Sequence, residues 1–391
     1  MGDVIPKPHG GRLVDRLVPE RERAHRTADL AGMKAIHASI DSVYDAEKIG
    51  LGAYSPLEGF MDRATLDSVL DRGRLPNDLP WSIPILLAPS GAENLSVVDS
   101  ARPGEEIALL DGSGDPFAVL HLEEKFPYDR QALARTTYGT TESAHPNVAD
   151  LQNAGAVALG GKIDLLRRLV LPTGRLELTP AEARAEFARR GWRNVAAYQC
   201  RNPPHTAHEY LQRLTLERED VDALFIQPVV GRLKKGDYRP EIILEAYQAL
   251  VRHYHPPDRV MLAALSITMR YAGPKAALFL AIIRKNFGCS HYIVGRDQAG
   301  VGTYYDPYAA HRIFDEFPID VLPLRYEETF FCRTCGWMAT KKTCPHPASD
   351  RVDTSQTRIR RALSEGSAPP PELLRPEVAE VLRQPNVILG A

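Results

Sequence analysis

The sequence predicts a mixed α/β protein, with a β-rich N-terminal part followed by a domain built on a parallel sheet. Two observations support this fold class. Residues 1–170 contain short apolar segments separated by Pro and Gly, whereas helical and strand patterns alternate from about residue 179. Such alternation is typical of a parallel sheet with helices on both faces. A chain of 391 residues can bury the cores of two or three domains.

The N-terminal part is expected to form strands at residues 81–87, 95–98, 106–110 and 117–122. The turn-forming residues Asp111 to Gly114 predict a hairpin between the last two strands. Residues 63–72 have the pattern of a helix, and the preceding stretch 57–61 shows no chemistry of its own. We therefore expect a sheet domain with few helices here.

The second part begins with a helix start at Thr179, where Pro180 suits the first turn and Glu182 the third position. The predicted elements then follow in order as strand 195–198, a helix from 204, strand 223–227, helix 240–253, strand 260–264, helix 274–287 and strand 291–294. The run 366–371 reads as a spacer before a last helix at 376–383. Ligands of parallel sheets bind at the carboxyl ends of the strands, and three polar motifs fall at such ends.

Composition restricts the function classes. The formal net charge is −2, with 44% hydrophobic and 25% charged residues, as in an ordinary globular protein. This balance favours neither nucleic acid nor a membrane as a partner. Residues 1–10 lack the apolar region of a secretion signal, and no stretch of 18 apolar residues occurs, so we expect a cytoplasmic protein.

The most polar motif covers residues 198–209, between an apolar strand and a helix. Asn202 is a suitable N-cap and Pro203 suits the first helical turn. A helix N-terminus attracts anions, and Arg201 adds a fixed positive charge beside it. His205 and His208, three residues apart, share one helix face. The motif therefore predicts a phosphate or sulfate site, although an isolated His-x-x-His pair is more often a surface or capping feature.

Two further strand ends carry candidate motifs. In Gly295-Arg296-Asp297-Gln298-Ala299-Gly300, the glycines allow close approach of a ligand and Arg296 can neutralise phosphate oxygens. Thr268 to Lys275 leads into the helix at 274, and Lys234 to Asp237 forms a basic loop. Taken alone, each of these three is interpreted as an ordinary loop rather than as a binding site.

A cysteine cluster follows the predicted parallel sheet. Cys332 and Cys335 form a Cys-x-x-Cys pair, Cys344 lies nearby, and His346 is the fourth candidate ligand. Three thiolates and one imidazole satisfy tetrahedral zinc, and a site with four protein ligands is structural. Buried free cysteines are the alternative. Cys200 lies outside the cluster and could be proposed as a nucleophile, since Arg201 and a helix N-terminus would lower its pKa.

Residues 199–208 resemble the Gln-x-Arg-Asn-Pro-x-His-x-x-His signature of the ATP sulfurylase family, specifically its prokaryotic zinc-containing members. The other motifs also resemble family motifs in the same order, namely 57–61, 234–237, 268–275, 295–300, the cysteine cluster and 355–361. Departures from the family pattern occur at Cys200, Thr206, Gln298 and Gln356. The family usually has Thr in place of Cys200 and forms no covalent enzyme intermediate, so the resemblance implies that Cys200 is a small packing residue. Gln298 replaces a His, which leaves its side-chain role in doubt.

The resemblance implies a PUA-like domain at 1–170, a Rossmann-like nucleotidyltransferase domain at 171–328 and a small zinc-bearing subdomain at 329–391. It also implies that ATP and sulfate give adenosine 5′-phosphosulfate (APS) and pyrophosphate, in a reaction that runs both ways. Magnesium (Mg²⁺) would accompany ATP, zinc (Zn²⁺) would be structural, and the chain would form a homodimer. No Gly-x-x-x-x-Gly-Lys-[Ser/Thr] sequence is present, so no fused kinase domain is expected.

By the same resemblance, sulfate would be held by Gln199, Arg201 and the backbone N–H of Ala299. ATP would be bound by Gln199, Asn202, His205, His208, Gly295, Arg296 and Asp297. The residues expected to be catalytic in the transfer of the AMP group are Arg201, Asn202, His205, His208 and Arg296.

Two alternatives belong to other classes. A nucleotidyltransferase that joins AMP to an organic phosphate would use a similar His-x-x-His pair. An RNA-binding protein with a PUA-like domain and a zinc site would need a basic, aromatic face, which the net charge of −2 and 7% aromatic content disfavour.

Overall fold

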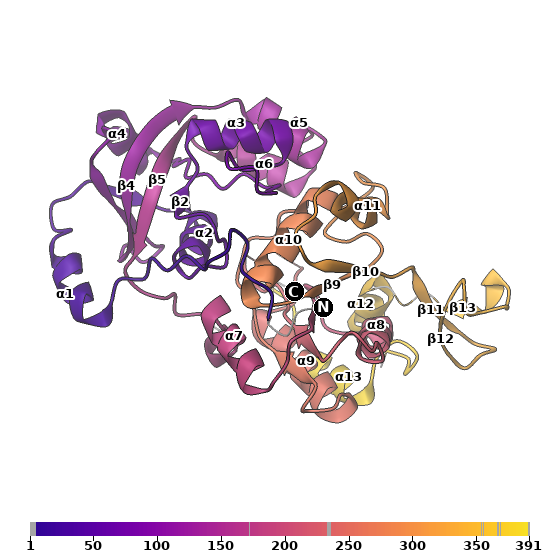
Figure 1. The fold of residues 1–391 in the computed structure, drawn as a ribbon. Coiled ribbons are helices and arrows are strands. Elements are labelled where there is room, and N and C mark those ends of the chain that lie inside the picture. The colour runs from indigo at the N-terminus through magenta and orange to yellow at the C-terminus, as the bar shows by residue number, and fades with distance from the viewer. Residues whose placement is uncertain are drawn as a thin grey trace.

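The computed structural model describes residues 5–171, 173–232, 236–352, 354, 356–365, 367 and 369–389. Figure 1 shows an N-terminal α/β domain beside a second α/β domain, from which a small β extension projects. Among the described residues, no helix combines the length and apolar character that crossing a membrane requires.

The N-terminal domain is a five-stranded sheet in the order β1-β3-β4-β5-β2, in which only β1 and β3 pair in parallel. Its strands are β1 (Ala35–His37), β2 (Gly59–Phe60), β3 (Glu106–Leu110), β4 (Pro116–Pro127) and β5 (Val157–Leu165). The hairpin expected between β3 and β4 is present, and β4 extends beyond the predicted 117–122. Helices are more numerous than expected: α1 (Glu20–Ala28), α2 (Ile40–Gly50), α3 (Arg63–Arg72), α4 (Ala92–Ser100), α5 (Arg130–Tyr138) and α6 (Pro146–Asn153).

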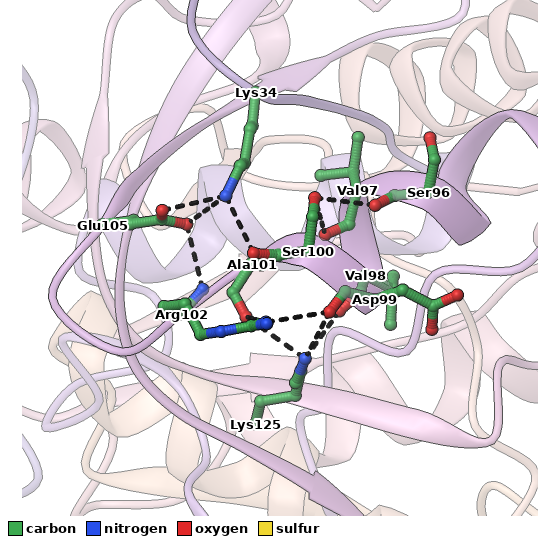
Figure 2. A network of polar contacts seen from close by, with 10 residues as sticks. All are labelled: Lys34, Ser96, Val97, Val98, Asp99, Ser100, Ala101, Arg102, Glu105 and Lys125. Carbon is green, nitrogen blue, oxygen red and sulfur yellow. Dashed lines mark hydrogen bonds and ion pairs between the residues drawn. The ribbon is translucent and has the colours of Figure 1, made fainter.

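The strand predicted at 95–98 was wrong, because these residues belong to helix α4. Asn94 and Val98, one turn apart, are buried, whereas Leu95 is 58% exposed. The Asn94 side chain accepts from the His37 N–H at 2.9 Å and donates to its carbonyl at 3.0 Å. Figure 2 shows Lys125 donating to three carbonyls at the C-terminus of α4, the favourable end for a cation. The prediction failed because a run of four residues with three apolar side chains is too short to distinguish the periodicity of a helix from that of a strand.

The strand predicted at 81–87 was also wrong as a regular element. Residues 81–87 are extended, but Leu87 forms only an isolated bridge with Leu159. Pro84 lies in the middle of the run and has no N–H to donate to a neighbouring strand. The apolar side chains, including Trp81 and Ile85, are instead buried as an irregular core segment.

The second domain contains a five-stranded, fully parallel sheet in the order β10-β9-β6-β7-β8. The strands are β6 (Val195–Tyr198), β7 (Ala223–Ile226), β8 (Val260–Leu262), β9 (His291–Val294) and β10 (Leu322–Arg325). The helices are α7 (Pro180–Arg189), α8 (Thr206–Leu216), α9 (Pro240–Tyr254), α10 (Pro274–Phe287) and α11 (Ala309–Glu316). The predicted β6, β9 and α10 have the observed bounds, and Thr179 forms the expected capping box with Glu182.

The strand order reverses between β6 and β9. The chain proceeds from β6 to β7 and β8 on one side, then returns to β9 and β10 on the other. Such a switch point leaves a crevice at the carboxyl ends of the two central strands. The motifs at 199–208 and 295–300 directly follow these two strands.

The predicted start of α8 was wrong. Its N-cap is His205, with extended backbone (φ −127°, ψ 171°), and not Asn202, so Pro203 precedes the helix. The Thr206 N–H donates to the Leu373 carbonyl at 3.0 Å, and the Thr206 hydroxyl donates to the Glu372 carbonyl at 2.6 Å. These contacts with a distant segment fix the helix start, so the local capping preference of Asn202 does not decide it.

The C-terminal part forms a small antiparallel sheet of β11 (Thr329–Cys332), β12 (Trp337–Thr340) and β13 (Arg351–Val352), followed by α12 (Gln356–Ser364) and α13 (Pro376–Leu382). Two short 3₁₀ helices complete the elements, at Gly174–Leu176 and Ala348–Asp350. Helix α13 returns to pack on α9, and Arg375 pairs with the buried Glu209 of α8 at 2.7 Å. Helix α13 therefore packs against the second domain, whereas the small sheet β11–β13 projects from it (Figure 1).

Candidate active site

The carboxyl ends of β6 and β9 open onto a cavity of about 440 Å³. Its wall includes every side chain that the sequence places in the anion and nucleotide sites, from the loops after both strands. These residues are Gln199, Arg201, Asn202, His205, His208, Gly295, Arg296, Asp297 and Ala299. The fold thus brings together two motifs that are about 90 residues apart in the sequence.

Arg201 is held in place by the third motif. Its guanidinium donates to the Tyr271 hydroxyl at 2.7 Å and lies over the Tyr271 ring at 4.9 Å from the centroid. Asp237 lies 3.9 Å from the same guanidinium. Lys234 and Lys235 of the basic loop lie outside the described residues, whereas Asp237 places the end of that loop beside the cavity. Tyr271 thus orients a cation at the edge of an anion-sized space.

The two histidines stack on each other, with ring centroids 3.5 Å apart and an angle of 21° between the planes. The backbone N–H of His205 donates to the His208 Nδ1 at 3.4 Å. Burial lowers the pKa of His208 to about 3. His208 is therefore neutral, and because its Nδ1 accepts, its proton is on Nε2. The His208 Nε2 lies 3.8 Å from Cys200 Sγ, and its N–H is the hydrogen-bond donor of this ring.

Cys200 contacts the site but is not activated. Burial raises its pKa, and its sulfur accepts the Asn202 N–H at 3.4 Å. Thiolate chemistry requires the opposite shift. The contacts favour the packing interpretation of Cys200.

A residue of α12 contacts the cavity wall from outside the lining. Arg360 donates to the Asn202 Oδ1 at 3.4 Å, contacts the Gly236 carbonyl and lies over the Tyr238 ring. Taken by its residues alone, the segment 355–361 reads only as a basic helix start, although it also resembles a family motif. Ser355 and the side chain of Gln356 lie outside the described residues. Arg360 thus supports the site through its contact with Asn202.

The loop after β9 has an unusual backbone. Asp297 (φ 54°) and Ala299 (φ 58°) occupy the left-handed region, which is unfavourable for residues other than glycine. The Ala299 carbonyl accepts from the Gly273 N–H at 3.1 Å, and the Asp297 N–H donates to the Pro307 carbonyl at 2.8 Å. Arg296 pairs with Glu328 at 3.0 Å. Neighbouring segments thus hold the loop in a strained form that lines the cavity.

Sequence reasoning missed two tyrosines and left Gln298 unexplained. Tyr292 lies inside the apolar strand β9 and reads as core, and Tyr271 lies in the third motif, which alone resembles a loop. Gln298 donates to the Tyr292 hydroxyl at 3.0 Å, and that hydroxyl donates to the Gln199 Oε1 at 3.0 Å. Gln298, which stands where the family motif has His, therefore has the Tyr292 hydroxyl as a hydrogen-bond partner.

A candidate metal centre lies in the β11–β12 region, away from the cavity. The ligand atoms of Cys332, Cys335, Cys344 and His346 all lie within 4.8 Å of one another. His346 Nδ1 is 3.3 to 3.7 Å from the three sulfurs, and the sulfurs of Cys335 and Cys344 are 3.8 Å apart. Tetrahedral zinc with its usual bond lengths separates such atoms by about 3.5 to 3.8 Å. The geometry therefore fits one tetrahedral ion and includes His346.

Comparisons with known proteins agree with this architecture. The family model described as ATP-sulfurylase matches residues 174–385, and the model described as PUA-like domain matches residues 6–168. The sulfate adenylyltransferase of Hyperthermus butylicus is 46% identical over 385 residues, covering 98% of this chain and 97% of the relative. That of Symbiobacterium thermophilum is 49% identical over 382 residues, covering 96% and 95%.

Among solved structures, the hexameric APS kinase from Thiobacillus denitrificans superposes with a TM-score of 0.75 at 26% identity, over 96% of this chain and 67% of that one. The predicted fold class is confirmed, with a PUA-like domain preceding a parallel-sheet domain and a Cys/His cluster near the C-terminus. The sheet order, the motifs at its switch point and these full-length relatives lead to one conclusion: the chain belongs to the ATP-sulfurylase family.

Proposed function

We propose that this protein is a sulfate adenylyltransferase, which transfers the AMP group of ATP to sulfate and releases pyrophosphate. The observation that carries the proposal is the single cavity in which Gln199 and Arg201 lie close to the His205–His208 pair and the loop 295–300. The full-length similarity to enzymes of that name supports it.

In the proposed reaction, a sulfate oxygen attacks the α-phosphorus and forms the new P–O bond. The bond from the α-phosphorus to the bridging oxygen breaks, and its electron pair leaves with pyrophosphate. Sulfate has no proton to remove near neutral pH, so the site needs no general base. The protein contributes positioning and charge stabilisation instead.

The proposed roles come from the family resemblance, and the position of these residues on one cavity wall supports them. Gln199, Arg201 and the Ala299 N–H would hold sulfate. Asn202, His205 and His208 would contact the ATP phosphates, where the neutral His208 offers its Nε2–H as a donor. Arg296, with Gly295 and Asp297, would bind the nucleotide from the opposite loop.

Mg²⁺ would accompany ATP as part of the substrate. Zn²⁺ would occupy the Cys332, Cys335, Cys344 and His346 cluster, whose donor set and spacing suit it. We also propose, from the family resemblance, a cytoplasmic homodimer with parts at 1–170, 171–328 and 329–391.

The first test is pyrophosphate release from ATP with and without sulfate. Arg201→Ala is expected to lower sulfate-dependent kcat about a hundredfold, since an oriented charged donor contributes roughly 3 kcal/mol in the transition state. Arg189→Ala is the matched control, because Arg189 is exposed on α7 and pairs only with Glu186 among its described contacts. Retention of more than a tenth of wild-type kcat by folded Arg201→Ala would contradict the role.

Replacing sulfate with molybdate distinguishes this activity from transfer to an organic phosphate. Adenylyl molybdate hydrolyses spontaneously, so the proposed enzyme releases AMP continuously from ATP. An enzyme specific for organic phosphates would not release AMP from ATP when molybdate is added.

A further inference from the structure

We infer that Tyr292 and Gln298 are positioning residues that fix the amide orientation of Gln199, so that the anion site offers donors and selects sulfate over hydrogen phosphate. This inference rests on the proposed function and on the proposed role of Gln199. It assigns a task to two residues that do not themselves touch the anion.

Gln298, Tyr292 and Gln199 form a chain of two hydrogen bonds, which we call the relay. The register of the strands brings these residues together. Tyr292 of β9 pairs with Ala197 of β6, and Gln199 follows two residues later. Because side chains alternate along a strand, Tyr292 and Gln199 project on the same side. Gln298 lies in the loop immediately after β9 and returns to the same hydroxyl. Three side chains from two chain segments thus meet at one oxygen.

A single proton gives the relay its direction. Tyr292 is fully buried, and burial raises its pKa, so its hydroxyl keeps its proton. Gln298 Nε2 donates to this hydroxyl, which in turn donates its only proton to Gln199 Oε1. With its oxygen committed in this way, Gln199 presents its NH₂ group to other partners. Arg201, two residues on, lines the same cavity.

This arrangement distinguishes two anions of equal charge and similar size. Sulfate carries no proton and only accepts hydrogen bonds. Hydrogen phosphate carries one O–H, which must find an acceptor when it is bound away from water. The relay removes the Gln199 oxygen as that acceptor, so hydrogen phosphate would lose a hydrogen bond that sulfate never needs.

The three carboxylates on the cavity wall are paired with cations. Glu328 and Asp297 contact Arg296 at 3.0 and 3.4 Å, and Glu327 contacts Lys342 at 2.8 Å. If Gln199 were reversed, its amide oxygen would add a neutral acceptor to the wall that also carries Arg201.

The Gln at position 298 adds a further property. The motif that this loop resembles has His there, which also offers an N–H but titrates near pH 6.5. An amide has the same donor at every working pH. The donor at position 298 of this chain therefore does not titrate in the pH range around 6.5 in which a His at the same place would gain a proton.

The test compares the KM for sulfate with the Ki of inorganic phosphate as a competitor of sulfate, at pH 8, where both are mainly dianions. Tyr292→Phe removes the relay hydroxyl, and Gln298→Glu replaces the donor with an acceptor. Both are expected to reduce the ratio of phosphate Ki to sulfate KM by about fivefold or more, the effect of one lost hydrogen bond, with the KM for ATP unchanged. Since both anions have the same charge, the added carboxylate in Gln298→Glu cancels in the ratio.

The controls separate positioning from loss of a hydroxyl. Tyr326→Phe removes a half-buried hydroxyl that contacts Thr215 outside the cavity and should leave the ratio unchanged. Gln298→His should restore it, with a sulfate KM that now falls as the pH is lowered through about 6.5, because the imidazolium adds positive charge. A ratio within twofold of wild type in both Tyr292→Phe and Gln298→Glu overturns the inference while the proposed function stands. Absence of sulfate-dependent pyrophosphate release in the wild type overturns both.

Discussion

At the scale of single residues, the loop after β9 shows how backbone conformation and ligand binding are connected. Asp297 and Ala299 both have positive φ, and hydrogen bonds from Gly273 and to Pro307 hold them there. A left-handed alanine costs about 1 to 2 kcal/mol relative to its favoured conformations. The loop accepts this cost where the Ala299 N–H is proposed to meet sulfate, which argues for strain that serves pre-organisation.

Ala299→Gly tests this connection. Relief of strain in the folded loop and greater freedom of the unfolded chain oppose each other, so the unfolding free energy should change by less than about 1 kcal/mol. The sulfate KM should rise several-fold because the loop is less ordered before binding. Urea unfolding and steady-state kinetics measure the two effects. Asn386→Gly is the control, a left-handed residue (φ 59°) outside the cavity wall, and should leave the KM unchanged.

The residue types of the candidate site could be predicted from the sequence because polar side chains at the end of an apolar strand have no structural reason to be there. Gln199, Arg201 and His205 were found in this way, and they line one cavity. Tyr292 could not be found, since a tyrosine within His291–Val294 is indistinguishable from core. Its role depends on the β6–β9 register, which no local pattern encodes.

At the scale of elements, long patterns with clear ends were predicted best. Helix α10 begins at Pro274 after Gly273 and ends before Gly288, so its bounds were readable. Residues 95–98 were misassigned because the apolar run was too short to show a period, and α8 because its start is fixed by residues 372–373. Errors therefore occurred where tertiary contacts outweigh local preference.

Thr206→Val tests whether the α8 start controls the nucleotide side of the site. The change removes the hydrogen bond to the Glu372 carbonyl while conserving shape, and should cost about 1 kcal/mol of unfolding free energy. It should also raise the KM for ATP, because the adjacent His205 and His208 depend on this helix end. Thr215→Val removes a hydroxyl on the same helix that donates to the Leu211 carbonyl and contacts the Tyr326 hydroxyl, and Thr215 itself is not among the residues that line the cavity. Thr215→Val should lower the unfolding free energy without raising the KM for ATP. An equal rise in the KM for ATP in both variants would contradict the proposed connection between the start of α8 and the site.

At the scale of the whole molecule, buried ion pairs join the two domains behind the site. Lys48 of α2 lies between Glu47 and Glu177 at 2.5 and 3.0 Å, and all three are buried. Arg270 of the third motif pairs with the buried Asp45 of α2. Tyr271, which orients Arg201, directly follows Arg270 in the chain, and Arg270 is anchored in the N-terminal domain. This dependence of the site on the PUA-like domain could not be predicted from the sequence, because nothing local links residue 45 to residue 270.

Metal removal tests the proposed structural role of zinc. Purified protein should contain about one zinc per chain, and a strong chelator should lower its Tm, because the ion joins the β11–β12 hairpin to Cys344 and His346. Cys335→Ser should do the same without chelator, whereas Cys289→Ser, which alters a buried cysteine of the second domain, should retain the zinc. Metal analysis and thermal unfolding provide the measurements. Full zinc content in Cys335→Ser would contradict the ligand set.

The contact of Thr206 with Glu372 and Leu373 also bears on how the protein is made. Synthesis proceeds from the N-terminus, and the PUA-like domain and both central strands emerge from the ribosome before residues 372–382. A nascent chain that ends before this segment lacks the bonds that fix the start of α8 and the Arg375–Glu209 pair. The histidine side of the cavity is thus completed last, so the proposed site for ATP is unfinished in a chain still in synthesis.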